Sequence, residues 1–149
     1  MEKEKQESIL DEIKKRRKHE WIEVMFSIEA MAINSDVVKS ALEEHIEKLS
    51  SIKDVYVYEK EFTSIERVKN PPRDIQEAYS QIAKVKLFAK DLYILINIVL
   101  VYGPSSIEIL GPNAKEIKAE EVQNILNILA GLMHQFAAAG VGGIVITPP

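Results

Sequence analysis

Alternation of apolar and polar positions predicts four β-strands between residues 21 and 110. The longest run covers residues 21–32, where every second side chain from Ile22 to Ala32 is apolar. Period two over twelve residues is typical of a strand with one buried face. Shorter runs rich in β-branched or aromatic residues predict the remaining strands at residues 55–58, 83–89 and 106–110.

Helical spacing predicts two helices between these strands. Ser35 offers a hydroxyl that can cap a helix, and apolar residues recur on one face from there to Leu49. Residues 92–102 fit either a helix or a strand, because the spacing is helical but five positions are β-branched. We favour the helix, since Asp91 can cap its start and Gly103 can end it. We also expect Asn97, in the middle of this segment, to be buried against a polar partner.

The order strand, helix, strand, strand, helix, strand over residues 21–110 predicts an α+β domain with the split βαβ arrangement. In element order the segment resembles ferredoxin-like folds, which ACT-type regulatory domains share. Asn70-Pro71-Pro72 interrupts the pairing, and a short helical turn is expected over residues 73–79. The face covered by the helices should be formed by Ile22, Val24, Phe26, Ile28, Val55, Val57, Ala83, Val85, Leu87, Ile107 and Ile109.

Residues outside 21–110 predict additions to a single domain spanning residues 21–149. Residues 1–20 are almost all polar and predict a solvated helical arm. A long helix is expected over residues 119–139, ended by Gly140. In the tail, residues 140–149, the apolar run 144–147 could add an edge strand.

Composition excludes several classes of protein. The 149 residues are 46% hydrophobic and 28% charged, which excludes a disordered chain, and the net charge of −4 is too small to indicate an acidic or basic partner. The absence of cysteine excludes disulfides and thiolate chemistry. No apolar signal segment follows the N-terminus, so we expect a cytoplasmic protein. Lys and Glu enrichment is typical of hyperthermophiles, although an AT-rich genome produces a similar bias.

Asp, Glu, Lys and Arg are absent from two segments, residues 92–107 and residues 122–149. In the second of these segments, His134 is the only titratable side chain. Within the second segment, apolar residues from Val122 to Ala139 recur at alternating spacings of three and four, which is the heptad pattern of packed helices. A homo-oligomer, a dimer or trimer, would cover such a helix; one helix packed on its own sheet is the other interpretation. The expected interface residues are Val122, Ile125, Leu129, Ala130, Leu132 and Phe136.

Signals for catalysis are weak, and we predict a non-catalytic protein without a cofactor or metal. His19, His45 and His134 do not form a metal-binding motif, and no nucleophile elbow or phosphate loop is present. A small-molecule ligand, if bound, would lie between subunits with His134 and Asn127 as its polar contacts. Too many polar groups interrupt residues 119–139 for a membrane-spanning helix.

Glu23 and Glu29 share one strand face with Trp21 and Met25, which leaves an enzyme open, although glutamates on a strand face are usually solvated. Two further functions remain open at this point. The first is a self-associating ferredoxin-like module with a regulatory or ligand-binding role. The alternative is a nucleic-acid-associated protein that uses the basic run at residues 14–18 and the open face of the sheet, where Tyr56 and Tyr58 could stack on bases. Nucleic acid is the less favoured partner, because residues 1–20 are almost neutral overall.

Overall fold

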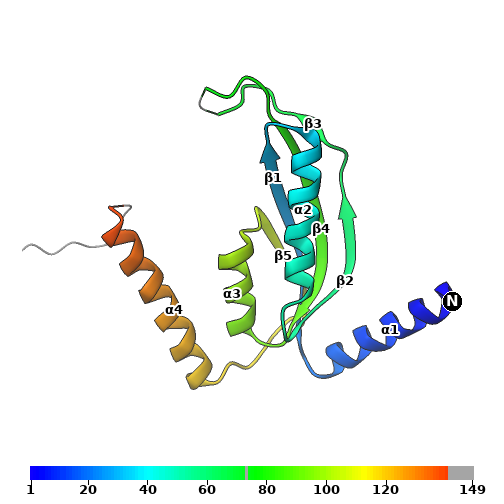
Figure 1. Ribbon diagram of the computed structural model, residues 1–149. Coiled ribbons are helices and arrows are strands. Elements are labelled where there is room, and N and C mark those ends of the chain that lie inside the picture. The colour runs from blue at the N-terminus through cyan, green and yellow to red at the C-terminus, as the bar shows by residue number, and fades with distance from the viewer. Residues whose placement is uncertain (73, 141–149) are drawn as a thin grey trace, which may run out of the picture. The chain divides into compact units, whose positions relative to one another are not determined.

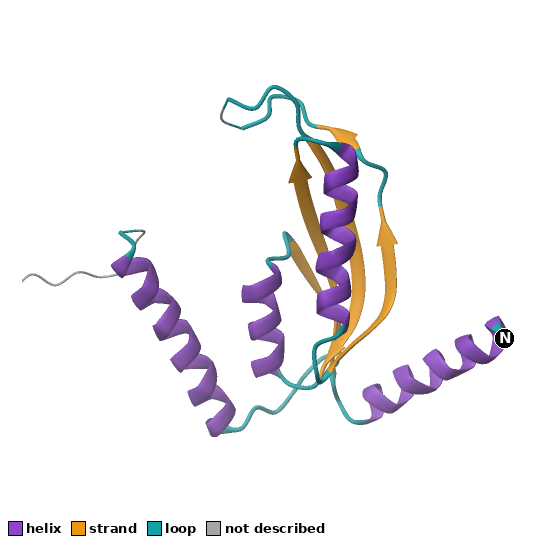
Figure 2. Cartoon of the chain, viewed as in Figure 1, coloured by secondary structure: helices purple, strands orange, loops and turns teal. Residues whose placement is uncertain are grey.

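The computed structural model describes residues 1–72 and 74–140, and the chain divides into two units, residues 1–115 and 116–149. Figures 1 and 2 show that the first unit contains a sheet with helices. Its elements are α1 (Glu2–Lys18), β1 (Ile22–Ala32), α2 (Ser35–Ser50), β2 (Val55–Phe62), β3 (Glu66–Arg67), β4 (Tyr79–Ala89), α3 (Leu92–Tyr102) and β5 (Ser106–Gly111). The second unit contains α4 (Ala119–Ala138).

The sheet has the strand order β2-β4-β1-β5, with every pair antiparallel and the short β3 attached to β4. At its centre, β1 and β4 pair along their whole lengths, from Ile22 opposite Ala89 to Ala32 opposite Tyr79. This order is the one expected when two βαβ halves interleave, so the predicted α+β, ferredoxin-like architecture is confirmed. The two-residue β3 is the one strand that the apolar pattern did not predict.

The core lies between the sheet and the helices α2 and α3, which cover the same face (Figure 2). Phe26 and Leu87 of the central strands are fully buried. Leu42 and Leu49 of α2 are exposed by no more than 1%. The helix-covered face predicted for β1, β2 and β4 is therefore confirmed. Burial of this apolar surface is the main favourable contribution to folding.

The prediction fails at the edge strand β5. Ile107 and Ile109 lie opposite Phe26 and Val24, so they point to the helix side as expected. Both are nevertheless exposed, by 43% and 58%. The reason is that α3 packs over β1 and β4, which leaves β5 beyond the edge of the helical layer.

The helix over residues 92–102 is confirmed, together with both of its end signals. The carboxylate of Asp91 accepts a hydrogen bond from the backbone N–H of Ile94 at 2.9 Å. Gly103 adopts the left-handed conformation with φ of 58°, which a glycine tolerates at a helix end. Asn97 differs from the prediction: it is half-buried and donates to the backbone oxygen of Tyr93 in its own helix.

Three local predictions need correction. The N-cap of α2 is Asn34, whose side chain accepts from the N–H of Asp36 at 2.8 Å, and Ser35 is the first helical residue. No helix forms over the described residues 74–79; instead β4 begins at Tyr79, because its pairing with β1 extends to Ala32. β2 likewise runs on to Phe62, past a register shift near Tyr58.

The terminal helices agree with their predicted bounds to within two residues. Gly140 has φ of 76° directly after the end of α4, as expected for a helix stop. The edge strand expected at residues 144–147 lies outside the described residues. None of the helices described combines the length and the apolarity needed to cross a bilayer.

Candidate functional site

The strongest candidate site lies on the open face of the sheet, the face opposite α2 and α3, where α1 meets β1 and β2. Its centre is Glu23, which is 6% exposed and is the one buried carboxylate among the described residues. The side chain follows the alternation of β1 and so points away from the helix-covered core. A carboxylate in this position must be paired, because burying an isolated charge is costly.

Glu23 is held by partners from two other elements. Arg17 of α1 donates to both carboxylate oxygens, from Nε to Oε1 at 2.9 Å and from Nη2 to Oε2 at 3.0 Å. Tyr58 of β2 donates its hydroxyl to Oε2 at 2.6 Å. The two parallel bonds from one guanidinium form the strong bidentate geometry.

These contacts shift the protonation of the site in a consistent direction. Hydrogen bonding from Arg17 lowers the pKa of Glu23, and the bond from Tyr58 lowers it further. The pKa of Tyr58 is raised well above its ordinary value. Burial is the larger cause, and the hydrogen bond to Glu23 is the next. At neutral pH the cluster is therefore an ionised carboxylate between a guanidinium and a neutral phenol.

An aromatic layer surrounds the charged cluster. The Arg16 guanidinium lies 4.0 Å from the ring centre of Tyr56 and 4.9 Å from that of Trp21, and it is also paired with Glu12. Cation–π contacts of this kind are attractive when the cation is partly desolvated. Tyr58 packs against Phe88, which is fully buried on the open face.

A reversal of the chain places α1 over this face. Glu20 has a positive φ of 59°, and Trp21 donates its backbone N–H to the carbonyl of Arg16 at 3.0 Å. Ile13 is buried as a result, whereas the first turns of α1 are exposed and extend away from the sheet (Figure 1). The predicted arm is thus exposed along its first turns, whereas near its end Ile13 is buried and Arg16 and Arg17 contact residues of the sheet.

Next to the cluster lies a cavity of about 210 Å³. Its lining residues are Arg17, Glu20, Trp21, Glu23, Leu110, Gly111 and Pro112. Both oxygens of Glu23 are already occupied by donors, and its lowered pKa makes it a weak base. The arrangement therefore fastens α1 to the sheet, and Glu23 is not free to act as an acid or base toward a molecule in the cavity.

Sequence reasoning noted Glu23 and Glu29 on one strand face but treated both as solvated. Glu29 is exposed, as expected, while Glu23 is not. A signal was present, because Arg16, Arg17 and Trp21 directly precede the strand. Using it required knowing that the chain reverses at Glu20.

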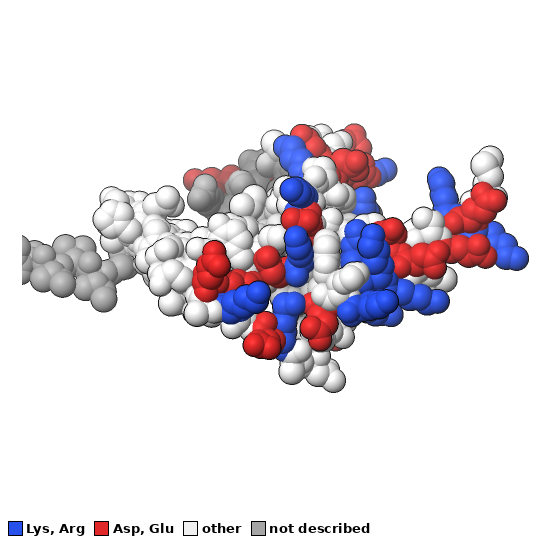
Figure 3. Space-filling model, turned by 90° about the horizontal axis from the view of Figure 1, so that it is seen from below, with Lys and Arg blue, Asp and Glu red and all other residues white. Residues whose placement is uncertain are grey.

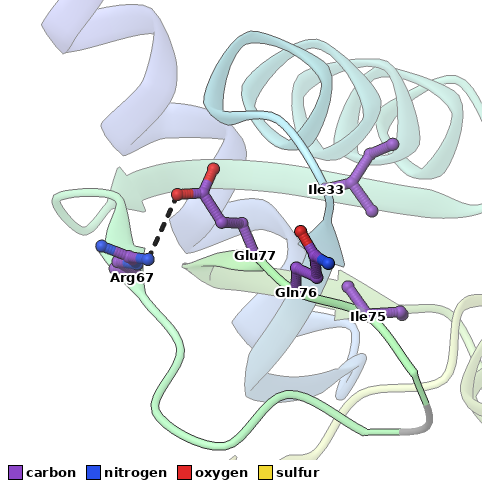
Figure 4. A pocket seen from close by; sticks show the side chains of 5 residues that line it. All are labelled: Ile33, Arg67, Ile75, Gln76 and Glu77. Carbon is purple, nitrogen blue, oxygen red and sulfur yellow. Dashed lines mark hydrogen bonds and ion pairs between the residues drawn. The ribbon is translucent and has the colours of Figure 1, made fainter.

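A second cavity, of about 550 Å³, opens near β3. Figure 4 shows Arg67 and Glu77 joined on one side of it, with Ile33 and Ile75 on the other. The ion pair spans 3.1 Å, and both of its side chains are more than half exposed. Such an exposed pair contributes little energy.

A third cavity, of about 300 Å³, lies beside α2 and the end of α3. His45 lies on its wall, half-buried, with Nε2 at 2.9 Å from the backbone oxygen of Tyr102. The two rings also meet edge to face, with centres 5.0 Å apart. His45 therefore joins the two helices, which is a structural role.

The residues predicted as site and interface fall on α4, in the second unit. Asn127, Ala130 and His134 are exposed. Of the expected apolar interface, Val122, Leu129 and Phe136 are exposed by about two-fifths, whereas Leu132 is half-buried and Ile125 is buried. Figure 3 shows the contrast with α1, since charged side chains line α1 and uncharged ones cover most of α4.

The described residues contain no group of three or more His, Asp or Glu side chains placed to hold a metal ion. Asn127 and His134 do not line any of the three cavities above. They are one heptad apart and so lie on the same side of α4. Asn127 accepts a long hydrogen bond, 3.4 Å, from Gln123.

Comparison with curated proteins and with solved structures gives no significant match. A family model matches residues 23–147, which include α4 and all of the sheet except Ile22. The match begins at Glu23 and leaves α1 outside, so the residue at the centre of the cluster is included and its Arg17 partner is not. On the evidence of this match over most of its length, the chain belongs to the MJ0538 family.

Proposed function

We propose that this protein is a self-associating ferredoxin-like module, which acts by assembly and serves a regulatory or small-ligand-binding role in the cytoplasm. The observation that carries the proposal is an exposed apolar stripe on α4. Its members, here called the α4 stripe, are Val122, Leu126, Leu129, Met133 and Phe136, exposed by 39–55%. No charged residue lies between Val122 and the end of the chain.

The physical argument concerns exposed apolar area. Soluble monomers rarely leave large contiguous apolar patches in water, and those that exist usually mark interfaces. Covering the stripe in a symmetric contact would remove it from water, at roughly 25 cal/mol per Å² before the costs of association. A helix exposed on all sides would normally carry charges on its outer face.

A second uncharged surface in the first unit supports the same proposal. Leu100 and Val101 of α3 are exposed by 42% and 70%, and Ile107 and Ile109 of β5 are exposed as described above. Because β5 is an edge strand, it also has backbone groups free to pair. We therefore expect residues 92–102 to help the assembly.

The nucleic-acid alternative remains a second hypothesis with less support. Arg16 and Arg17 of the basic run already pair with Glu12 and Glu23. Tyr58 gives its hydroxyl to the same cluster, and Arg16 lies over the ring of Tyr56. These four side chains are therefore engaged within the chain, which leaves Lys14, Lys15 and Lys18 as the exposed cations of the basic run.

Sedimentation equilibrium of the full chain tests the proposal. We expect a dimer or trimer at tens of micromolar, with little change as salt is raised, because burial of apolar surface is not screened. A monomer at that concentration would contradict self-association. Binding to a mixed-sequence RNA or DNA that weakens steeply with salt would instead favour the alternative.

A further inference from the structure

The α4 stripe has a more specific property than exposure, and this inference rests on the proposed function. Its five members follow one another at spacings of four, three, four and three residues. This is the a/d pattern of a coiled coil, with Leu126 and Met133 at a positions and Val122, Leu129 and Phe136 at d positions. A seam of this kind packs best against a second helix that has the same repeat.

We propose that the partner of α4 is the α4 of a second copy of this chain, packed antiparallel to it. The register places Leu126 beside Leu129 of the second copy and Val122 beside Met133. Phe136, the largest member, then lies beside Ala119 of the second copy, the smallest residue on that side. All five members of the stripe are paired in this register.

The distribution of charge selects the antiparallel orientation. The charges of α4 are Glu120 and Glu121, both in its first turn, and no Lys or Arg follows them in the helix. A parallel pair would bring four carboxylates together at one end, together with two helix N-termini. An antiparallel pair separates the carboxylates and opposes the helix dipoles, which is favourable.

The positions that flank the seam allow a close approach. Gln123, Ala130 and Ala137 occupy the e positions, and Ile125 and Leu132 occupy the g positions, so no charge flanks the contact. Coiled coils commonly use charged e and g residues to choose a partner. Here the seam itself and the end charges must set the orientation.

The size of the contact sets the expected affinity. α4 has 20 residues, and a helix of that length is about 30 Å long and roughly 10–12 Å wide. A pair along its whole length buries on the order of 1,000 Å² in total, near the lower bound for a specific interface. We therefore expect dissociation in the micromolar range. Asn127 and His134 lie on the opposite side of α4, so any ligand they bind would contact the outside of the pair.

The absence of cysteine allows a direct test of orientation by introduced disulfides. When a full chain carrying Val122→Cys is mixed with one carrying Met133→Cys, mild oxidation should link the two different chains, because these positions meet across an antiparallel pair. Each of the two chains alone should give little covalent dimer, because Val122 and Met133 pair with themselves only in a parallel coil. Leu129→Cys alone should give little dimer, since Leu129 pairs with itself only in a parallel coil.

Charge substitutions test the seam itself, with a matched control on the same helix. Leu129→Glu should raise the dissociation constant at least tenfold, because it places a charge in the seam. Asn127→Glu introduces the same charge on the opposite side and should leave the dissociation constant within about twofold. Circular dichroism of both variants checks that α4 is still helical.

The outcomes separate this inference from the proposed function. A dimer that crosslinks through Leu129→Cys, and that links Val122→Cys or Met133→Cys chains only to their own kind, overturns the antiparallel arrangement and retains self-association. A dimer that tolerates Leu129→Glu shows that another surface forms the contact. A chain that stays monomeric at tens of micromolar overturns both proposals.

Discussion

The two faces of the sheet are covered by different chemistry. On the helix side, Phe26 and Leu87 pack against apolar residues of α2 and α3. On the open side, the end of α1 is held by the pairing of Glu23 with Arg17 and Tyr58, with Phe88 buried beneath. The first face depends on many interchangeable apolar contacts, whereas the second depends on a few specific ones. The comparison predicts that mutations on the two faces lower the free energy of unfolding by different amounts and with a different dependence on pH.

The largest effect is expected for Phe26→Ala on the helix side. Phe26 is fully buried, and its removal should cost about 3–5 kcal/mol of unfolding free energy, as for other large core residues. Phe88→Ala removes the same ring from the open side and should cost less than Phe26→Ala, because α1 is attached only by its last turns and can relax into the gap. Urea denaturation measures both. A loss below about 1 kcal/mol for Phe26→Ala would show that the register of β1 is wrong, and equal losses would remove the distinction between the faces.

A smaller effect is expected for Glu23→Ala. It leaves Arg17 and Tyr58 without their acceptor and should cost roughly 1.5–3 kcal/mol, the range for hydrogen bonds to a charged group. Arg17 is 60% exposed and can be solvated again, which limits the loss. Glu29→Ala is the matched control on the same strand, and we expect it to change stability by less than about 0.5 kcal/mol. Hydrogen exchange of α1 should rise in the first variant alone; unchanged protection would mean that Glu23 does not fasten the helix.

The smallest effect is a pH dependence that belongs to the open face. Because the pKa of Glu23 is lowered by folding, its contribution is present above about pH 4.5 and is lost as the pH falls below that value. Folding raises the pKa of Tyr58. Its contribution to stability is therefore present below about pH 10 and is lost as the pH rises above that value. Denaturation of the unmutated chain and of Glu23→Gln should be measured between pH 3 and 7. The free energy of unfolding should fall less steeply toward acid pH in the variant. Identical slopes would contradict this assignment.

The same contrast explains which parts of the structure were predictable from the sequence. Period-two alternation identified the helix-covered face of β1 from Ile22 to Ile28. Asp91 and Gly103 mark the two ends of a helix, and they decided between helix and strand for residues 92–102. These signals are local, because each depends on neighbours along the chain. The exposure of Ile107 and Ile109 was missed, since it depends on where α3 packs across the sheet.

The site under α1 was missed for a related reason. Arg17 and Glu23 are six residues apart, and they meet because Glu20 takes a left-handed conformation that is uncommon for a glutamate. Tyr58 comes from a strand more than thirty residues away. On α4, the heptad spacing was visible in the sequence, but the exposures show that Leu126 and Met133 belong to the outer stripe and that Ile125 does not.

The pairing of β1 with β4 has a consequence for the order of folding. α2, β2 and β3 all lie between these two strands in the chain, so the central pair is a non-local contact of the kind that slows folding. During synthesis, β1 leaves the ribosome long before its neighbours on either side, and α2 is the first element that can shelter its apolar face. The sheet is complete once β5 has been made. α4 follows it and forms by local contacts, so we expect copies of this protein to meet as folded bodies.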